Sequence, residues 1–300
     1  MGSGSIMKAA LREGLIIPSF NIPHLPMIEP IARAIVDEQI VAFIAVARVE
    51  WEKFESRSAD AVREEYEKFR HPEHTRLHLD HIPVIDEDGL RVDVMPIIGH
   101  ALDIGFDSVM IDGSRLPFDD NLDATRDAAG LAHAAGKPIE AELGAIFGHE
   151  GDLPPSYEEI FASKRGFTDP RAAQTFVQQT QCDWLSVAIG SIHGGVSDAL
   201  RDVKKVTARL DLDHLRKVSE ATKIPLVLHG GSGIDSSFVR RSAALGISKM
   251  NIGTETRQVY EQTLRESGDP GRAREAVYAR ARWFISDMLG ISGSRRKLEG

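Results

Sequence analysis

Short apolar segments alternate with amphipathic segments along the whole 300-residue chain, and this alternation limits the fold to a series of βα units. The expected strands are residues 16–21, 40–47, 76–81, 107–112, 138–143, 184–189, 225–229 and 247–252. The expected helices are residues 26–38, 55–70, 95–104, 120–135, 170–181, 211–222 and 235–244, followed by a helical region at 255–289. Eight strands, each followed by a crossover, predict an α/β fold with a single (β/α)8 TIM barrel.

An open, doubly wound sheet is the main alternative to the barrel. Such a sheet usually carries its glycine-rich loop after the first strand, whereas here the glycine-rich turns follow the seventh and eighth strands. We therefore expect one barrel domain over residues 7–291, with its active site at the C-terminal ends of the strands. Residues 1–6 and 292–300 are rich in glycine and serine, and we expect linker-like or disordered ends there.

The composition argues against several classes of function. The formal net charge of -9 and the absence of a basic run argue against nucleic-acid binding. No apolar stretch reaches the ~20 residues that cross a bilayer, so we expect no membrane partner. The single cysteine, Cys182, cannot form an intrachain disulfide and suits a reducing cytoplasm, which is the location that we expect.

Three histidines stand at or just after the ends of predicted strands: His81, His193 and His229. Because strand ends meet at one mouth in a parallel barrel, these side chains should lie close together. Neutral imidazoles are the commonest ligands of a zinc ion that keeps one position open for substrate. His78 lies three residues before His81, a spacing that places it on the opposite face of the strand in a structural role. Other polar residues at the strand ends are Asp80, Asp112, Glu140, Glu142 and Asn251.

Two glycine-containing turns, at 230–233 and 251–254, follow the seventh and eighth strands. The first precedes a helix expected near Asp235, and the free backbone N–H groups of a helix N-terminus bind phosphate. A zinc ion beside a phosphate site indicates Lewis-acid activation of a carbonyl in a phosphorylated ketose. Asp80, next to a metal ligand, is placed to move the hydroxyl proton beside the scissile bond. A Schiff-base route would need a lysine at a strand end, and the sixth strand contains none.

Seven stretches together resemble the class II, metal-dependent ketose-bisphosphate aldolase family, which includes fructose-bisphosphate and tagatose-bisphosphate aldolases. They are residues 77–81, 105–114, 140–144, 168–170, 189–194, 228–233 and 249–254. The resemblance extends from about residue 9 to residue 291. It implies a metal-dependent aldolase that cleaves or forms a ketose phosphate. Dihydroxyacetone phosphate and an aldehyde would be the two halves, and the reaction would pass through a zinc-stabilised enediolate.

The resemblance also implies a metal centre with named ligands. His81, His193 and His229 would hold the zinc, while Asp112 and Glu142 would form an alternative metal position. Another divalent ion, such as cobalt or manganese, is an alternative to zinc. The resemblance leaves room for a monovalent cation as well, and it implies a homodimer or a homotetramer.

Two acids and a set of substrate contacts follow from the same resemblance. Asp80 would donate the proton to the aldehyde-derived oxygen in condensation and accept it in cleavage. Glu150, in the long loop after the fifth strand, would move the proton on the dihydroxyacetone-phosphate carbon. The implied contacts with the sugar phosphate are Asn21, Gly194, Gly230, Gly231, Ser232, Asn251, Ile252, Gly253 and Thr254.

Departures from the family pattern bear on the substrate rather than on the reaction. Residues 82–94 form an acidic insertion after the third strand, and the second strand runs into bulky, charged residues that include Arg48. Gly253 stands where fructose-bisphosphate aldolases tend to carry an aspartate. Two alternatives to this aldolase remain open. One is a related metal-dependent carbon–carbon lyase acting on a different phosphorylated sugar or a sugar acid. The other is a non-catalytic sugar-phosphate-binding protein on the same scaffold.

Overall fold

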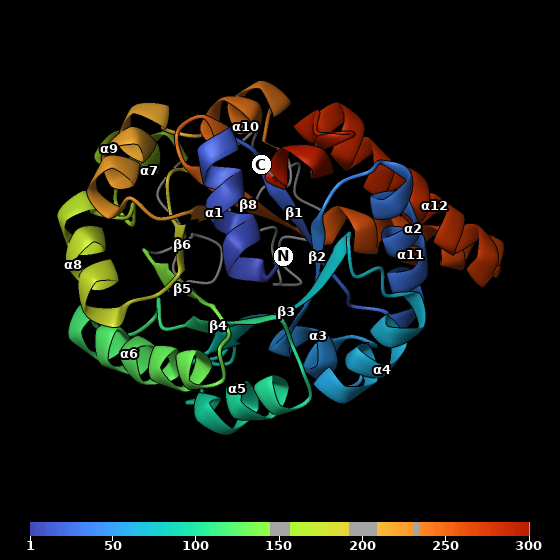
Figure 1. Cartoon of the computed structure of the whole chain (residues 1–300), viewed down its shortest axis with the longest axis horizontal. Coiled ribbons are helices and arrows are strands. Elements are labelled where there is room, and N and C mark those ends of the chain that lie inside the picture. The colour runs from blue at the N-terminus through green and yellow to red at the C-terminus, as the bar shows by residue number, and fades with distance from the viewer. Residues whose placement is uncertain (145–156, 192–208, 231–233, 300) are drawn as a thin grey trace.

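The structure is a computed structural model that describes residues 1–144, 157–191, 209–230 and 234–299. Eight parallel strands pair in sequence order and β1 pairs with β8, so the sheet closes into a barrel (Figure 1). The strands are β1 (Ile17–Asn21), β2 (Ala42–Ala47), β3 (Thr75–Pro83), β4 (Ser108–Asp112), β5 (Ile139–Leu143), β6 (Trp184–Val187), β7 (Leu226–Leu228) and β8 (Ile247–Ile252). The predicted TIM barrel is confirmed.

Helices surround the barrel and connect its strands (Figure 1). Among the described residues they are α1 (Ser3–Glu13), α2 (Ile28–Asp37), α3 (Arg48–Lys53), α4 (Ala59–Phe69), α5 (Val94–Asp103), α6 (Phe118–Ala134), α7 (Tyr157–Ser163), α8 (Pro170–Thr180), α9 (Leu212–Thr222), α10 (Ser236–Ala243), α11 (Thr254–Ser267) and α12 (Pro270–Trp283). Shorter helical turns are η1 (Leu25–Met27), η3 (Phe284–Leu289) and η4 (Ser294–Leu298). None of the helices within the described ranges is long and apolar enough to cross a bilayer.

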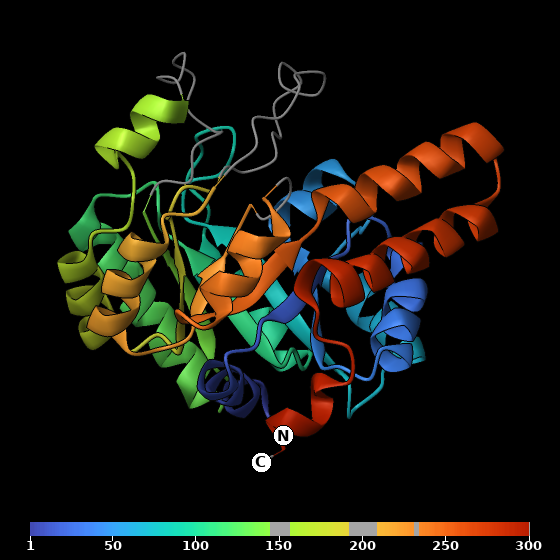
Figure 2. The same ribbon diagram turned by 90° about the horizontal axis from the view of Figure 1, so that it is seen from above.

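Local sequence signals explain where several helices begin and end. Asp169, Asp211 and Asp235 stand at the N-caps of α8, α9 and α10, and each side chain accepts backbone N–H groups of the first turn. The helical region expected at 255–289 is divided, because α11 ends at Gly268 with a left-handed φ of 64°. Pro270 then begins α12. The two helices form a hairpin that projects from the barrel (Figure 2).

Apolar side chains are buried in two separate clusters. The larger cluster lies between the strands and the surrounding helices and includes Phe20, Ile44 and Leu79. The smaller cluster includes Phe43 and Trp184, on β2 and β6. Because it also includes residues of α1 and η4, this smaller cluster lies at the N-terminal end of the barrel, opposite the strand ends that carry the site.

The chain ends fold onto the barrel, in contrast to the linker-like or disordered ends expected for residues 1–6 and 292–300. The helix α1 begins at Ser3, and its Ile6 and Met7 are buried in the smaller cluster. The turn η4 contacts α1 and buries Leu298 in the same cluster. Burial of these apolar side chains outweighs the low helix propensity of the glycine and serine residues beside them. Both termini lie together at this end of the molecule (Figure 2).

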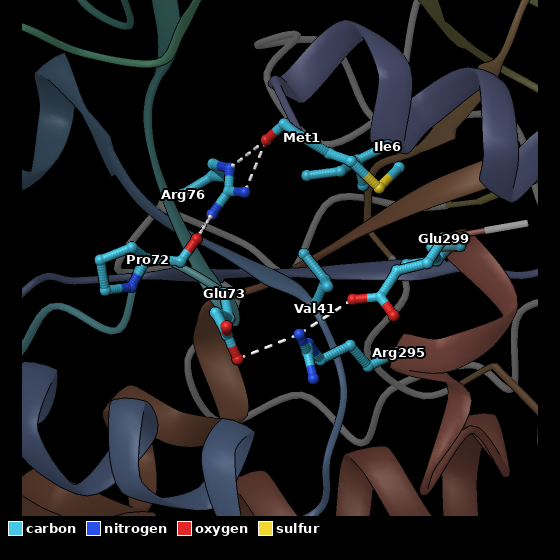
Figure 3. A pocket seen from close by; sticks show the side chains of 9 residues that line it. Met1, Ile6, Val41, Pro72, Glu73, Arg76, Arg295 and Glu299 are labelled. Carbon is cyan, nitrogen blue, oxygen red and sulfur yellow. Dashed lines mark hydrogen bonds and ion pairs between the residues drawn. The ribbon is translucent and has the colours of Figure 1, made fainter.

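A buried arginine fastens the first residue to the barrel. Arg76, on β3, donates from Nη2 to the Met1 carbonyl oxygen at 2.6 Å and from Nη1 to the Pro72 carbonyl oxygen at 2.6 Å (Figure 3). Beside it, Arg295 of η4 lies 3.0 Å from Glu73 and 2.9 Å from Glu299 (Figure 3). These polar contacts line a small pocket between the two chain ends and β3.

Candidate functional site

Two of the predicted metal ligands meet at the C-terminal mouth of the barrel. His81, on β3, and His229, just after β7, have ring centroids 4.4 Å apart. Glu142, on β5, joins them, since its Oε2 lies 3.0 Å from His229 Nδ1 and 3.9 Å from His81 Nδ1. One ligand atom from each of these three side chains lies within 4.8 Å of the other two. Imidazole nitrogens and a carboxylate oxygen at this spacing fit a divalent cation.

An irregularity in β3 turns His81 into the mouth. The pairing of β3 with β4 shifts register between Leu79 and Ile82, and His81 adopts a φ of 40°. The alternation of side chains therefore breaks at this point. The expectation that His78 and His81 occupy opposite faces is wrong, because His78, Asp80 and His81 all point into the barrel.

The second nitrogen of His229 has a carboxylate partner of its own. His229 Nε2 lies 3.0 Å from Glu140 Oε1, and both side chains are fully buried. A carboxylate on one ring nitrogen fixes the tautomer and leaves the other nitrogen to face the metal. The other ring nitrogen, Nδ1, lies 3.0 Å from Glu142 Oε2 and would face the metal. With Nε2–H directed at Glu140, Nδ1 would be the nitrogen that binds a metal.

Negative charge around His81 also suits a cation. Burial opposes a charged imidazole, but Asp80, Asp112 and Glu142 together raise the pKa of His81 to about 10. His81 Nδ1 lies 3.4 Å from Asp112 Oδ2, so Asp112, predicted with Glu142 as an alternative metal position, belongs to the same cluster. The field that holds a proton on His81 would equally favour a divalent ion in its place.

Asp80 lies beside the metal cluster and is held as a carboxylate. Burial would raise the pKa of Asp80, but the charges of His81 and Lys249 lower it well below its usual value. Asn21 donates to Asp80 Oδ2 at 2.8 Å. Asn251 donates to both carboxylate oxygens at 2.9 Å. Two amides therefore fix the orientation of this carboxylate next to His81.

The predicted phosphate segments are only partly described. Gly230 follows β7 with a φ of 67°, whereas Gly194, Gly231 and Ser232 lie outside the described residues. Gly253 packs against Asn21, since a Cβ at Gly253 would lie 3.2 Å from the Asn21 Cβ. A larger side chain at this position would therefore press on the residue that holds Asp80.

Residues 251–254 divide between β8 and the start of α11. Asn251 and the buried Ile252 belong to β8, and α11 begins at Thr254. The free backbone N–H groups of this helix N-terminus suit a phosphate. Two further predicted residues, the ligand His193 and the acid Glu150, lie outside the described residues and stay predictions.

Sequence reasoning missed one buried carboxyl group at the mouth. Glu50 lies in the first turn of α3, just after Ala47, which is the β2 register partner of Asp80. Its Oε2 accepts the Ala47 N–H at 2.8 Å, and its carboxyl group also hydrogen-bonds the Asn21 side chain. Burial, with the charge of Asp80, raises the pKa of Glu50 to about 8. In sequence, Glu50 resembles an ordinary helix-capping glutamate, and only the strand pairing places it at the site.

Comparisons with known proteins agree with this arrangement. A family model described as "Fructose-bisphosphate aldolase class-II" matches residues 3–293. The solved structure of the YdjI aldolase from Escherichia coli K12 is 27% identical, with a TM-score of 0.76 over 96% of this chain and 97% of that chain. The structure of the fructose-bisphosphate aldolase from Campylobacter jejuni, 18% identical, shares the fold with a TM-score of 0.72 over 97% of this chain and 96% of that chain. All three matches span the complete barrel.

Proposed function

The chain belongs to the class-II fructose-bisphosphate aldolase family, and we propose that it cleaves or forms a ketose phosphate. The two halves of that substrate are dihydroxyacetone phosphate and an aldehyde, and zinc is the proposed metal. Membership of the family makes the chain a metal-dependent aldolase; the substrate, the choice of zinc and the roles of individual residues are the proposal.

One observation carries this proposal: the cluster of His81, Glu142 and His229 lies directly beside Asp80. A divalent ion held by these ligands, with His193 as a further predicted ligand, would polarise the carbonyl of a bound ketose. Two imidazoles and a carboxylate are a ligand set that zinc favours. Metal ligands next to a fixed carboxylate support carbon–carbon bond cleavage assisted by proton transfer.

The residues of the chain itself would bind and move protons as follows. In cleavage, the Asp80 carboxylate accepts the proton of the hydroxyl on the carbon next to the scissile bond, and in condensation it returns that proton. The amides of Asn21 and Asn251 hold the carboxylate in one orientation. Backbone N–H groups at the start of α11, near Gly253 and Thr254, suit the substrate phosphate.

The test is a retro-aldol assay over a panel of ketose mono- and bisphosphates, in which release of triose phosphate is coupled to a dehydrogenase. We expect release from at least one member of the panel. Asp80→Ala should lower kcat by roughly 10²-fold or more, since it removes the proton carrier and no metal ligand. Asp103→Ala, at the exposed end of α5, is the control and should behave like the unaltered chain. A zinc-loaded chain that cleaves no member of the panel would contradict the proposal.

A second candidate substrate class is supported by the segment at 82–94. Its hairpin carries a bridge between Ile85 and Arg91, and Asp86 accepts the backbone N–H groups of Asp88 and Leu90. Arg48 Nη1 lies 3.4 Å from Asp86 Oδ2, and Arg115 donates to the Asp86 carbonyl oxygen. Three arginines therefore stand on or against this ordered hairpin.

Arginine recognises planar carboxylates, so this hairpin supports a ketose phosphate whose aldehyde half carries an acid group. Mass spectrometry of the aldehyde product separates the two candidates. Release of a neutral aldehyde from the preferred substrate would rule out the acid-bearing class, and release of an aldehyde acid would establish it.

A further inference from the structure

A second layer of polar side chains lies within the barrel, directly beneath the mouth. His78, Glu140 and Lys249 each stand two positions before a mouth residue on the same strand, namely Asp80, Glu142 and Asn251, so each pair points the same way. All three lower residues are fully buried. We infer that Lys249 is a positioning residue, whose single ammonium group orients the metal ligand His229 and the proton carrier Asp80 together.

The first branch runs from Lys249 to Asp80. Lys249 Nζ donates to Asn251 Oδ1 at 2.8 Å. An amide whose oxygen accepts from an ammonium group must direct its NH₂ group the other way, and Asn251 Nδ2 donates to both Asp80 oxygens at 2.9 Å. Without Lys249, the Asn251 amide could rotate and place its oxygen against the Asp80 carboxylate. The lysine therefore fixes the direction of the hydrogen bond that holds Asp80.

The second branch runs from Lys249 to His229. Lys249 Nζ also donates to Glu140 Oε2 at 2.8 Å, and Trp184 Nε1 donates to the same oxygen at 2.6 Å. The other oxygen of Glu140, Oε1, lies 3.0 Å from His229 Nε2. Two donors on one oxygen leave the second oxygen to accept from the imidazole. Glu140 is thereby held where it keeps His229 Nδ1 turned toward Glu142 and the metal position.

The charges of this layer explain why a cation is needed there. Asp80 and Glu140 are two buried carboxylates, and His78 Nε2 lies 3.6 Å from the first and 3.5 Å from the second. Unpaired buried carboxylates are costly, and Lys249 Nζ, 2.8 Å from Glu140 and 3.8 Å from Asp80, lies near both. The Lys249 ammonium donates hydrogen bonds to Glu140 and Asn251, so it serves as a structural charge and not as a nucleophile. The predicted mechanism likewise uses no Schiff-base lysine.

The experiment is Lys249→Met, which keeps the length of the side chain and removes its charge. Two properties are measured: the affinity of the metal-free chain for Zn²⁺, by competition with a chromophoric chelator, and kcat at saturating Zn²⁺. We expect the affinity to fall roughly tenfold to a hundredfold. We also expect kcat to fall by about tenfold or more while KM stays within about threefold, because Lys249 lies beneath the mouth and is fully buried. Lys217→Met, on the exposed face of α9, is the matched control.

A change in only one of the two properties overturns the inference. Should Lys249→Met fail to fold, Lys249→Met combined with Glu140→Gln removes both charges and leaves no unpaired carboxylate at position 140. This double variant should show the same loss of kcat at saturating metal, and an unchanged kcat would overturn the inference.

The inference rests on the proposed function, but different results would refute the inference and the function. An unaltered chain that binds no Zn²⁺ and releases no triose phosphate refutes the function, whereas an active one insensitive to Lys249→Met refutes only the inference.

Discussion

Glu50 makes the stability of the metal-free chain depend on pH in a predictable direction. Its side chain is buried at the mouth, and burial together with the charge of Asp80 raises the pKa of Glu50 from 4.5 to about 8. A carboxyl group whose pKa is raised on folding stabilises the chain fully below its unfolded pKa. That stabilisation is lost as pH rises toward the folded pKa. The window of loss therefore runs from about pH 4.5 to about pH 8.

The magnitude follows from the size of the pKa shift. Each pKa unit corresponds to about 1.4 kcal/mol of differential stabilisation, so complete ionisation of Glu50 costs about 5 kcal/mol of unfolding free energy. Glu50→Gln keeps the shape and the hydrogen-bonding oxygen but cannot ionise. We expect Glu50→Gln to lie within about 1 kcal/mol of the unaltered chain near pH 5 and to be more stable by about 5 kcal/mol near pH 9.

The assay is urea-induced unfolding of both chains, freed of metal by dialysis against chelator, at several pH values across this window. The difference between the two chains isolates Glu50, because all other titrating groups are shared. A difference that changes by less than about 1 kcal/mol between pH 5 and pH 9 would refute the reasoning. It would mean that the Glu50 carboxyl group is solvated or paired with a cation, and not buried against Asp80.

Two further predictions concern parts of the chain away from the mouth. Arg76→Met should lower the free energy of unfolding, measured in urea, by about 1–3 kcal/mol, because it leaves the Met1 and Pro72 carbonyl oxygens without their donor. An unchanged free energy of unfolding would show that these hydrogen bonds do not stabilise the fold. Cys182 is buried, and burial raises the pKa of its thiol to about 12. A chromogenic aromatic disulfide that reports free thiols should therefore react with Cys182 at pH 8 only after denaturant is added. Rapid reaction of the folded chain would place Cys182 at the surface.

The barrel could be predicted from sequence because its signals are local. Strands such as β2 and β7 are short apolar runs, and N-capping residues such as Asp169 and Asp235 mark where helices begin. His81, His229 and Glu142 could be placed together because strand ends converge in any parallel barrel. The folded chain ends were missed, because Ile6 and Leu298 find their partners only in tertiary contacts at the far end of the barrel.

Side-chain partners on distant strands set the limit of prediction at the site. Lys249 and Glu140 are separated by 109 positions, and no sequence pattern pairs the two residues. Regular alternation predicted the wrong face for His78, because the irregularity after Leu79 depends on how β3 pairs with β4. Glu50 required the pairing of Ala47 with Asp80. Irregular strands and buried polar networks are therefore the features that only the folded chain reveals.

Metal reconstitution of the metal-free chain tests the central claim most directly. The chain is stripped with chelator, Zn²⁺ is added in measured steps, and triose-phosphate release from the preferred ketose phosphate is followed together with bound metal. The account predicts no release from the stripped chain and a rise in rate that saturates at about one metal ion per chain. Full activity in the stripped chain, with chelator still present, would contradict the assignment of His81, Glu142 and His229 to a catalytic metal.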